Sequence, residues 1–145
     1  MQGKFFRITP DGKTFYALSG SGLLTECVAR KADKREIANN VMNFDLSPDG
    51  SILYYVNMDN ELHVVSGRKD TVAAEKVYAP GEGLCVTDGG HLYYLQNYSN
   101  GKGTLCYLRD AGRAHVLDEI DKVYDIAADT GDYIYYRSDY FPISG

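Results

Sequence analysis

The sequence lacks both the basic surface of a nucleic-acid-binding protein and the long apolar run of a membrane protein. Its 145 residues carry 15 lysines and arginines against 20 aspartates and glutamates, a net charge of −5. The basic residues at 30–31 and 34–35 are diluted by Asp33 and Glu36, so no cluster could neutralise several phosphates. No apolar run approaches the roughly 20 residues that a helix needs to cross a bilayer. We therefore expect no nucleic-acid partner and no membrane span in this segment.

Signals for export and for a disulfide framework are also few. Residues 1–7 lack the apolar stretch of a secretory signal peptide. A segment of a longer secreted protein would lack it too, so an extracellular or cell-envelope location stays open. The three cysteines, Cys27, Cys85 and Cys106, form no Cys-x-x-Cys pair, and we interpret them as small core residues. One disulfide, such as Cys85 to Cys106, is left open.

Tryptophan is absent, and the aromatic residues are 13 tyrosines and 5 phenylalanines. Tyrosine favours strands, in which its ring covers apolar surface while its hydroxyl reaches water or a carbonyl. Hydrophobic residues make up 44% of the chain, which is enough for a packed core. The composition therefore predicts a folded domain that is rich in strands.

A repeat of a tight turn followed by a tyrosine-bearing apolar run is the most informative pattern. Proline, aspartate and glycine in the turns favour a chain reversal, because proline presets φ and glycine accepts a positive φ. A period of about 40 residues built from short strands is typical of a β-propeller blade. We take Gly12, Gly50, Gly89 and Gly131 as equivalent positions. The four copies are Pro10-Asp11-Gly12 before Phe15-Tyr16, Pro48-Asp49-Gly50 before Leu53-Tyr54-Tyr55, Asp88-Gly89-Gly90 before Leu92-Tyr93-Tyr94, and Thr130-Gly131 before Ile134-Tyr135-Tyr136.

Each repeat is expected to form one four-stranded antiparallel sheet. In the second repeat the expected strands are Phe44–Leu46, Ile52–Val56, Leu62–Val65 and Lys76–Tyr78. In the third repeat, Asn97–Gly103 is expected to be a long loop. The blades then cover approximately residues 4–40, 41–80, 81–119 and 120–145, of which the last is partial. The fold class is therefore all-β, with about three and a half propeller-type blades, fewer than the roughly four to eight that close a ring.

A helix over Asp33–Phe44 is the competing interpretation of one segment. Asp33 and Glu36 resemble a capping box, and Ile37, Val41 and Phe44 recur at helical spacing. The repeat argues against this helix, because the segment at the same phase of the second repeat contains a proline and two glycines.

The turns Thr9-Pro10-Asp11-Gly12 and Ser47-Pro48-Asp49-Gly50, each followed by tyrosine-bearing strands, carry a family resemblance. They resemble the repeat of TolB-type propellers and of the propeller domains of prolyl-oligopeptidase-like proteins. The resemblance implies that this turn joins the first two strands of each blade. The tyrosine-rich later repeats also resemble uncharacterised bacterial surface-protein propellers. Because one fold hosts many functions, the resemblance implies no activity.

Catalytic and metal-binding motifs are missing. The stretch Ser19-Gly20-Ser21-Gly22 lacks the spacing of a hydrolase nucleophile elbow. The histidines His63, His91 and His115 have no second ligand at metal spacing. We therefore predict no catalytic residue, no metal site and no cofactor.

The candidate site residues are two aspartates and two tyrosines. Asp45 and Asp125 lie near the first strand of their repeats, the strand that lines the central channel of a propeller. Their carboxylates could bind a cation or a basic group there, or bond to backbone at the strand end. Tyr98 and Tyr140 are candidate loop contacts to a ligand.

These observations favour a protein that is not an enzyme. We predict a non-catalytic propeller segment that acts as a protein-interaction or ligand-presenting scaffold. The alternatives are an accessory or gating propeller of a larger peptidase or hydrolase, and a carbohydrate-binding module. The expected partner is another protein or a second copy of the chain, because an unfinished blade exposes strand edges.

Overall fold

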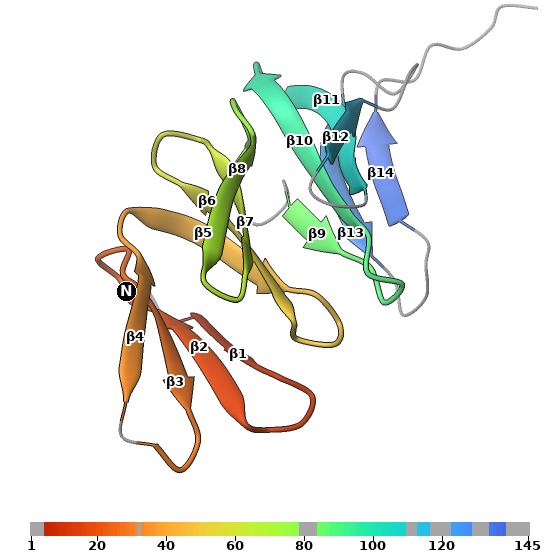
Figure 1. Ribbon diagram of the computed structural model, residues 1–145. Coiled ribbons are helices and arrows are strands. Elements are labelled where there is room, and N and C mark those ends of the chain that lie inside the picture. Colours follow the sequence, from red (N-terminus) through yellow and green to blue (C-terminus); the bar gives the residue numbers. More distant parts are fainter. Residues whose placement is uncertain are drawn as a thin grey trace, which may run out of the picture.

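A computed structural model describes residues 5–31, 33–78, 84–109, 113–116, 123–128 and 134–138. The described chain is all-β and forms antiparallel sheets that follow one another in sequence order (Figure 1). Two sheets have four strands each, and the third has six, which are the four strands of a blade and a hairpin that pairs with one of them. The predicted fold class, propeller-type four-stranded blades without a closed ring, is confirmed. In the described ranges no helix is long and apolar enough to cross a membrane.

The strand bounds define the blades. Blade one contains β1 Phe5–Ile8, β2 Thr14–Leu18, β3 Leu24–Val28 and β4 Lys34–Ala38. Blade two contains β5 Val41–Leu46, β6 Ile52–Asn57, β7 Leu62–Ser66 and β8 Lys69–Ala74. Blade three contains β9 Leu84–Val86, β10 Leu92–Ser99, β11 Lys102–Arg109 and β12 Arg113–Val116. The hairpin of blade four is β13 Val123–Ala128 with β14 Ile134–Ser138, and Val123 pairs with Gly103 of β11.

The tight turns use the residues that the repeat singled out. In blade two the Ser47 hydroxyl donates to Asp49 Oδ1 at 2.7 Å, and the Ser51 backbone N–H donates to the same oxygen at 3.0 Å. The Gly50 N–H donates to the Ser47 carbonyl at 2.8 Å, and Gly50 has a φ of +77°. The bonds that Asp49 accepts from Ser51 and Ser47, led by the one from the Ser51 backbone, lower the pKa of Asp49 to about 2. The turn is therefore held by an ionised carboxylate.

The third turn differs from the expected register by one residue. Gly90, and not Gly89, has the positive φ, and its N–H donates to the Thr87 carbonyl at 2.9 Å. Strand pairing still aligns Tyr93 with Tyr54, because Tyr93 lies opposite Cys85 as Tyr54 lies opposite Asp45. The third turn is therefore shortened after its glycine while the strands keep their register.

Two predictions, one of an outer strand and one of a loop, are wrong. The fourth strand of blade two is β8 Lys69–Ala74, and Val77 beyond it forms only an isolated bridge with Gln96. Four of the six β8 residues are exposed, so this strand carries no apolar signal. The segment Asn97–Gly103 is not a long loop, since β10 and β11 run to Ser99 and from Lys102 around Asn100-Gly101. Both turn residues have positive φ, and neither is a proline.

The competing helix over Asp33–Phe44 is absent. The strands β4 and β5 occupy this segment, and Asn40, with a φ of +57°, reverses the chain between them. Ile37, Val41 and Phe44 share a core because they come from two blades that pack together. Their helical spacing is therefore a coincidence of strand ends.

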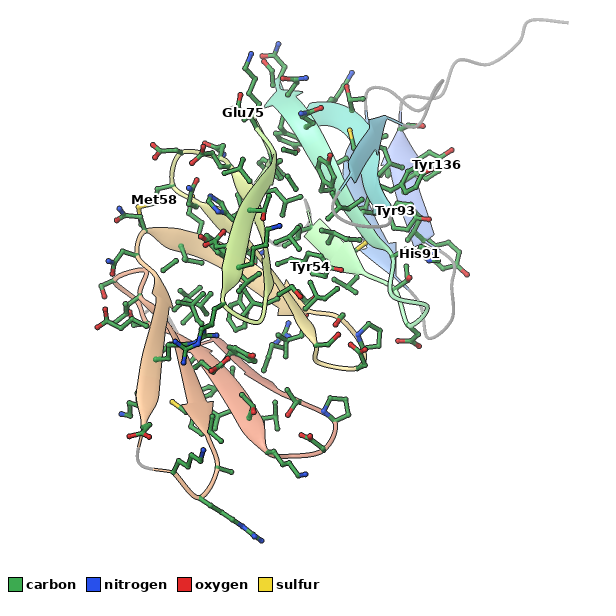
Figure 2. The ribbon with its side chains drawn as sticks, viewed as in Figure 1. Tyr54, Met58, Glu75, His91, Tyr93 and Tyr136 are labelled. Atoms are coloured by element: carbon green, nitrogen blue, oxygen red, sulfur yellow. The ribbon has the colours of Figure 1, made fainter. Side chains whose placement is uncertain are left out.

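The core lies between adjacent blades, and Figure 2 shows Tyr54 in such a layer, between blade two and blade three. Blades one and two share Tyr16, Leu18, Leu24, Val41, Phe44, Leu46, Leu53, Tyr55 and Val65. Blades two and three share Tyr54, Val56, Leu62, Val77, Leu84, Leu92, Tyr94, Cys106 and Leu108. Leu95, Leu105, Val123 and Ile126 join blade three to the hairpin. All three cysteines are free, and Cys27 and Cys106 are buried.

Candidate functional site

The first strands of successive blades carry polar or reactive residues at one equivalent position. Arg7 of β1, Asp45 of β5 and Cys85 of β9 each lie opposite the repeated tyrosine of the second strand, Tyr16, Tyr54 and Tyr93. The first strand is the edge strand of its sheet in blades one and two, and β5 lies against β9. The repeat therefore brings these three positions into a row that crosses the blades.

Arg7 and Asp45 form an ion pair between blades one and two. The Arg7 Nε donates to Asp45 Oδ1 at 3.2 Å, and the Leu46 backbone N–H donates to the same oxygen at 2.8 Å. The Arg7 Nη1 also donates to the Phe6 carbonyl at 3.0 Å, which anchors the guanidinium. A carboxylate with two donors, one of them cationic, keeps a fixed orientation. Because both side chains keep some exposure, water and small molecules can reach the pair.

Cys85 continues the row and has an unreactive thiol. Burial, assisted by the negative charge of Asp45, raises the pKa of the Cys85 thiol to about 11. The thiol is therefore protonated at neutral pH, and a nucleophile of this kind needs the thiolate form. The groups of this row that are charged and can act on a ligand are therefore the Asp45 carboxylate and the Arg7 guanidinium.

The structure places the four predicted site residues differently. Asp45 lies in the row on β5. The backbone of Asp125 lies on β13 opposite Arg137, and its side chain is outside the described part of the chain. Tyr98 lies in β10 and not in a loop, and its ring stacks on Tyr78 with centroids 3.7 Å apart. Tyr140 lies outside the described residues. Channel lining by the aspartates and ligand contact by the tyrosines stay predictions.

Arg7 is the site residue that the sequence analysis missed. Its signal was available, since Arg7 precedes Gly12 by the same interval as Asp45 precedes Gly50. The pattern is one of opposite charges at the same position in neighbouring repeats.

Comparisons with known proteins give one structural likeness. No family model matches the chain, and no curated protein matches it. Among solved structures, the chain is similar to "a putative 6-phosphogluconolactonase" from Bacteroides uniformis, with a TM-score of 0.56 and 14% sequence identity. The match covers 91% of this chain and 42% of that chain, so this chain spans less than half of its length. At this identity the likeness shows the fold alone.

This likeness corrects the resemblance and the functions predicted from the sequence. The structural neighbour is named as a lactonase and not as a TolB-type or prolyl-oligopeptidase-type protein. The name of this neighbour, a lactonase, stands against the predictions of a non-catalytic scaffold and of no enzyme, and it gives no support to the accessory-domain and carbohydrate-binding alternatives. The physical reason is that the Asp-Gly turn and the tyrosine register define blade geometry, which propellers of different families share.

Proposed function

We propose that this chain contributes blades to a propeller hydrolase of the lactonase type, which opens the ring ester of a sugar-derived lactone. The observation that carries the proposal is the fold likeness to "a putative 6-phosphogluconolactonase" over 91% of the chain. The Arg7–Asp45 pair supports it, because it joins a carboxylate to a cation at an exposed edge of two blades. The activity belongs to the whole protein that contains these blades.

The pair matches the charge changes of lactone hydrolysis. Asp45 accepts a proton from a water molecule as the water oxygen bonds to the lactone carbonyl carbon. The negative charge that develops on the carbonyl oxygen is stabilised by the Arg7 guanidinium. The bond between the carbonyl carbon and the ring oxygen then breaks, and the ring oxygen takes up the proton that Asp45 accepted, which gives a hydroxy acid and restores the carboxylate. Cys85 takes no part, since its thiol stays neutral.

The test is a titration at constant pH of the acid released from glucono-δ-lactone and from 6-phosphogluconolactone, with spontaneous hydrolysis subtracted. Asp45→Asn keeps the shape of the side chain and removes the base, so it should lower kcat by about 10²- to 10⁴-fold. Arg7→Gln should lower kcat as well, because it removes the cation. Lys69→Gln on the exposed strand β8 is the matched control and should leave the rate unchanged.

Two results would overturn the proposal. One is a rate no higher than spontaneous hydrolysis for both lactones with the full protein. The other is an Asp45→Asn variant that is folded by circular dichroism and as active as the parent, which would place the chemistry elsewhere.

A further inference from the structure

A second polar site lies between blades one and two, on the outer-strand side of the Arg7–Asp45 pair. It is a cavity of about 320 Å³, within the size range of small-molecule sites. Its polar wall comes from Tyr16, Glu26, Arg35, Ser51 and Arg68, and its apolar wall from Ile37, Leu53 and Val65. No local sequence pattern marks this site, because its residues come from three strands of one blade and from strands and turns of the next.

Arg35 is the central residue of the cavity and has an unused donor. Its Nη2 donates to Glu26 Oε2 at 3.1 Å and to the Gly67 carbonyl at 3.2 Å. Its Nε is buried and has no hydrogen-bond partner. A buried donor on a charged group is costly when it is left without an acceptor. Because the Nε–H is covered, a solute in the cavity meets the exposed part of the Arg35 side chain and not this atom.

The charges around the cavity favour an anion. Glu26 is already engaged, since Oε2 accepts bonds from Arg35 and, at 2.9 Å, from the Tyr16 hydroxyl. Arg68 brings a second positive charge and has no ion-pair partner among the residues that the structure describes. Two arginines against one glutamate leave one uncompensated positive charge. The Arg35 side chain as a whole is 36% exposed, so a solute can reach part of it from solvent.

The polar wall is not a requirement of the fold. In blade one, strand pairing puts Tyr16 opposite Glu26 and Glu26 opposite Arg35. The equivalent row of blade two runs from Tyr54 to Val64 and Thr71, with no charged residue. Blade two therefore forms the same sheet without a glutamate or an arginine at these positions.

We propose that this cavity binds a small monocarboxylic acid with an apolar body. The carboxylate pairs with the Arg35 and Arg68 side chains that line the cavity, while the body packs on Ile37, Leu53 and Val65. One excess positive charge matches a monoanion better than a phosphate dianion, and a hydrocarbon body matches the apolar wall. Arg35 lies on β4 and Arg7 on β1, about 14 Å apart at ordinary strand spacing, with Tyr16 and Glu26 between them in one row across the sheet.

Calorimetric titration with three probes tests the proposal: benzoate, its neutral analogue benzamide, and inorganic phosphate. Benzoate should bind, and benzamide and phosphate should each bind at least about tenfold more weakly, since a charge-assisted bond is lost or the charge is mismatched. Arg35→Gln and Arg68→Gln should each weaken benzoate binding by about tenfold or more. Lys34→Gln is the control, because Lys34 is exposed and neighbours Arg35 on the same strand but does not line the cavity.

The outcomes separate clearly. Equal binding of benzamide overturns the anion site, and equal binding of phosphate overturns the carboxylate assignment. Unchanged benzoate affinity in Arg68→Gln overturns the site even if Arg35→Gln fails to fold, because Arg68 is an exposed turn residue. No heat from benzoate with the folded parent protein also overturns it.

Discussion

Replacing Gly50 by alanine tests how the turns lock neighbouring blades together. A Cβ at position 50 would lie 2.7 Å from Thr9 Cγ2 and 3.0 Å from Thr9 Cβ, in the turn of blade one. Its φ of +77° adds backbone strain for any residue with a Cβ, about 1–2 kcal/mol. Overpacking against Thr9 adds about 1–3 kcal/mol. The expected loss of unfolding free energy is therefore about 2–5 kcal/mol, a decrease in Tm of roughly 5–20 °C for a domain of this size.

Gly12 provides a matched control for the strain alone. It has a φ of +70° in the equivalent turn, and a Cβ there would meet no atom within 4 Å. Gly12→Ala should therefore cost only about 1–2 kcal/mol. Thr9→Ser removes the clashing methyl group and keeps the hydroxyl that donates to Asp11, so it should recover about 1 kcal/mol in the Gly50→Ala background.

Urea denaturation measures these differences. The proteins compared are the parent, Gly50→Ala, Gly12→Ala, Thr9→Ser and the double variant of Gly50→Ala with Thr9→Ser. A cost of Gly50→Ala no larger than that of Gly12→Ala would show that the contact between the two turns has no energetic consequence. A Thr9→Ser change that gives no recovery specific to the Gly50→Ala variant would show that the Thr9 methyl group does not clash.

Two further predictions concern acid stability and association. Because the pKa of Asp49 is about 2 in the folded protein and about 3.8 in the unfolded chain, its stabilisation is present above pH 3.8 and lost as the pH falls toward 2. The urea midpoints of the parent and Asp49→Asn should therefore differ at pH 6 and converge near pH 2; a constant difference would contradict this. On the open face of blade one, Phe6 and Ile8 are 51% and 66% exposed, whereas Phe44 and Leu46 at the equivalent positions are 1% and 8% exposed beneath the preceding blade. Light scattering should give a mass above 16.1 kDa that falls to this value in Phe6→Glu, and a monomeric parent would remove the proposal that copies associate through this face.

The sequence was sufficient for the blades because turn and strand signals are local. Pro48-Asp49-Gly50 and the tyrosine run after it fix a turn and the register of the first hairpin, and the first three strands of blade two were found within one to three residues. The outer strand β8 was missed because an exposed strand has no apolar alternation to detect. Propensity is informative where a strand is buried and weak where solvent covers it.

The site was less predictable, because its contacts join residues of different blades. Asp45 was identified from its place in the repeat, but its partner Arg7 required the register of two first strands. Tyr98 was expected in a loop because Asn97 and Gly101 are turn residues, yet only Asn100-Gly101 forms the turn. Stacking on Tyr78 then places the Tyr98 ring against neighbouring core residues. Packing between blades decides such side chains, and no local pattern records it.

The repeat itself offers a way to separate fold from site, since equivalent positions in another blade show what the sheet requires. Glu26→Val together with Arg35→Thr gives blade one the Val64 and Thr71 of blade two at the same register. The double variant should keep a Tm close to that of the parent, because removing both members of a partly buried ion pair costs little. Arg35→Thr alone should be less stable than the double variant, since it leaves Glu26 with only the Tyr16 hydroxyl as its side-chain partner. Benzoate binding should be lost in both. If the double variant instead melts far below the parent, the charged row is part of the structure of blade one, and its difference from blade two has a structural and not a ligand-binding cause.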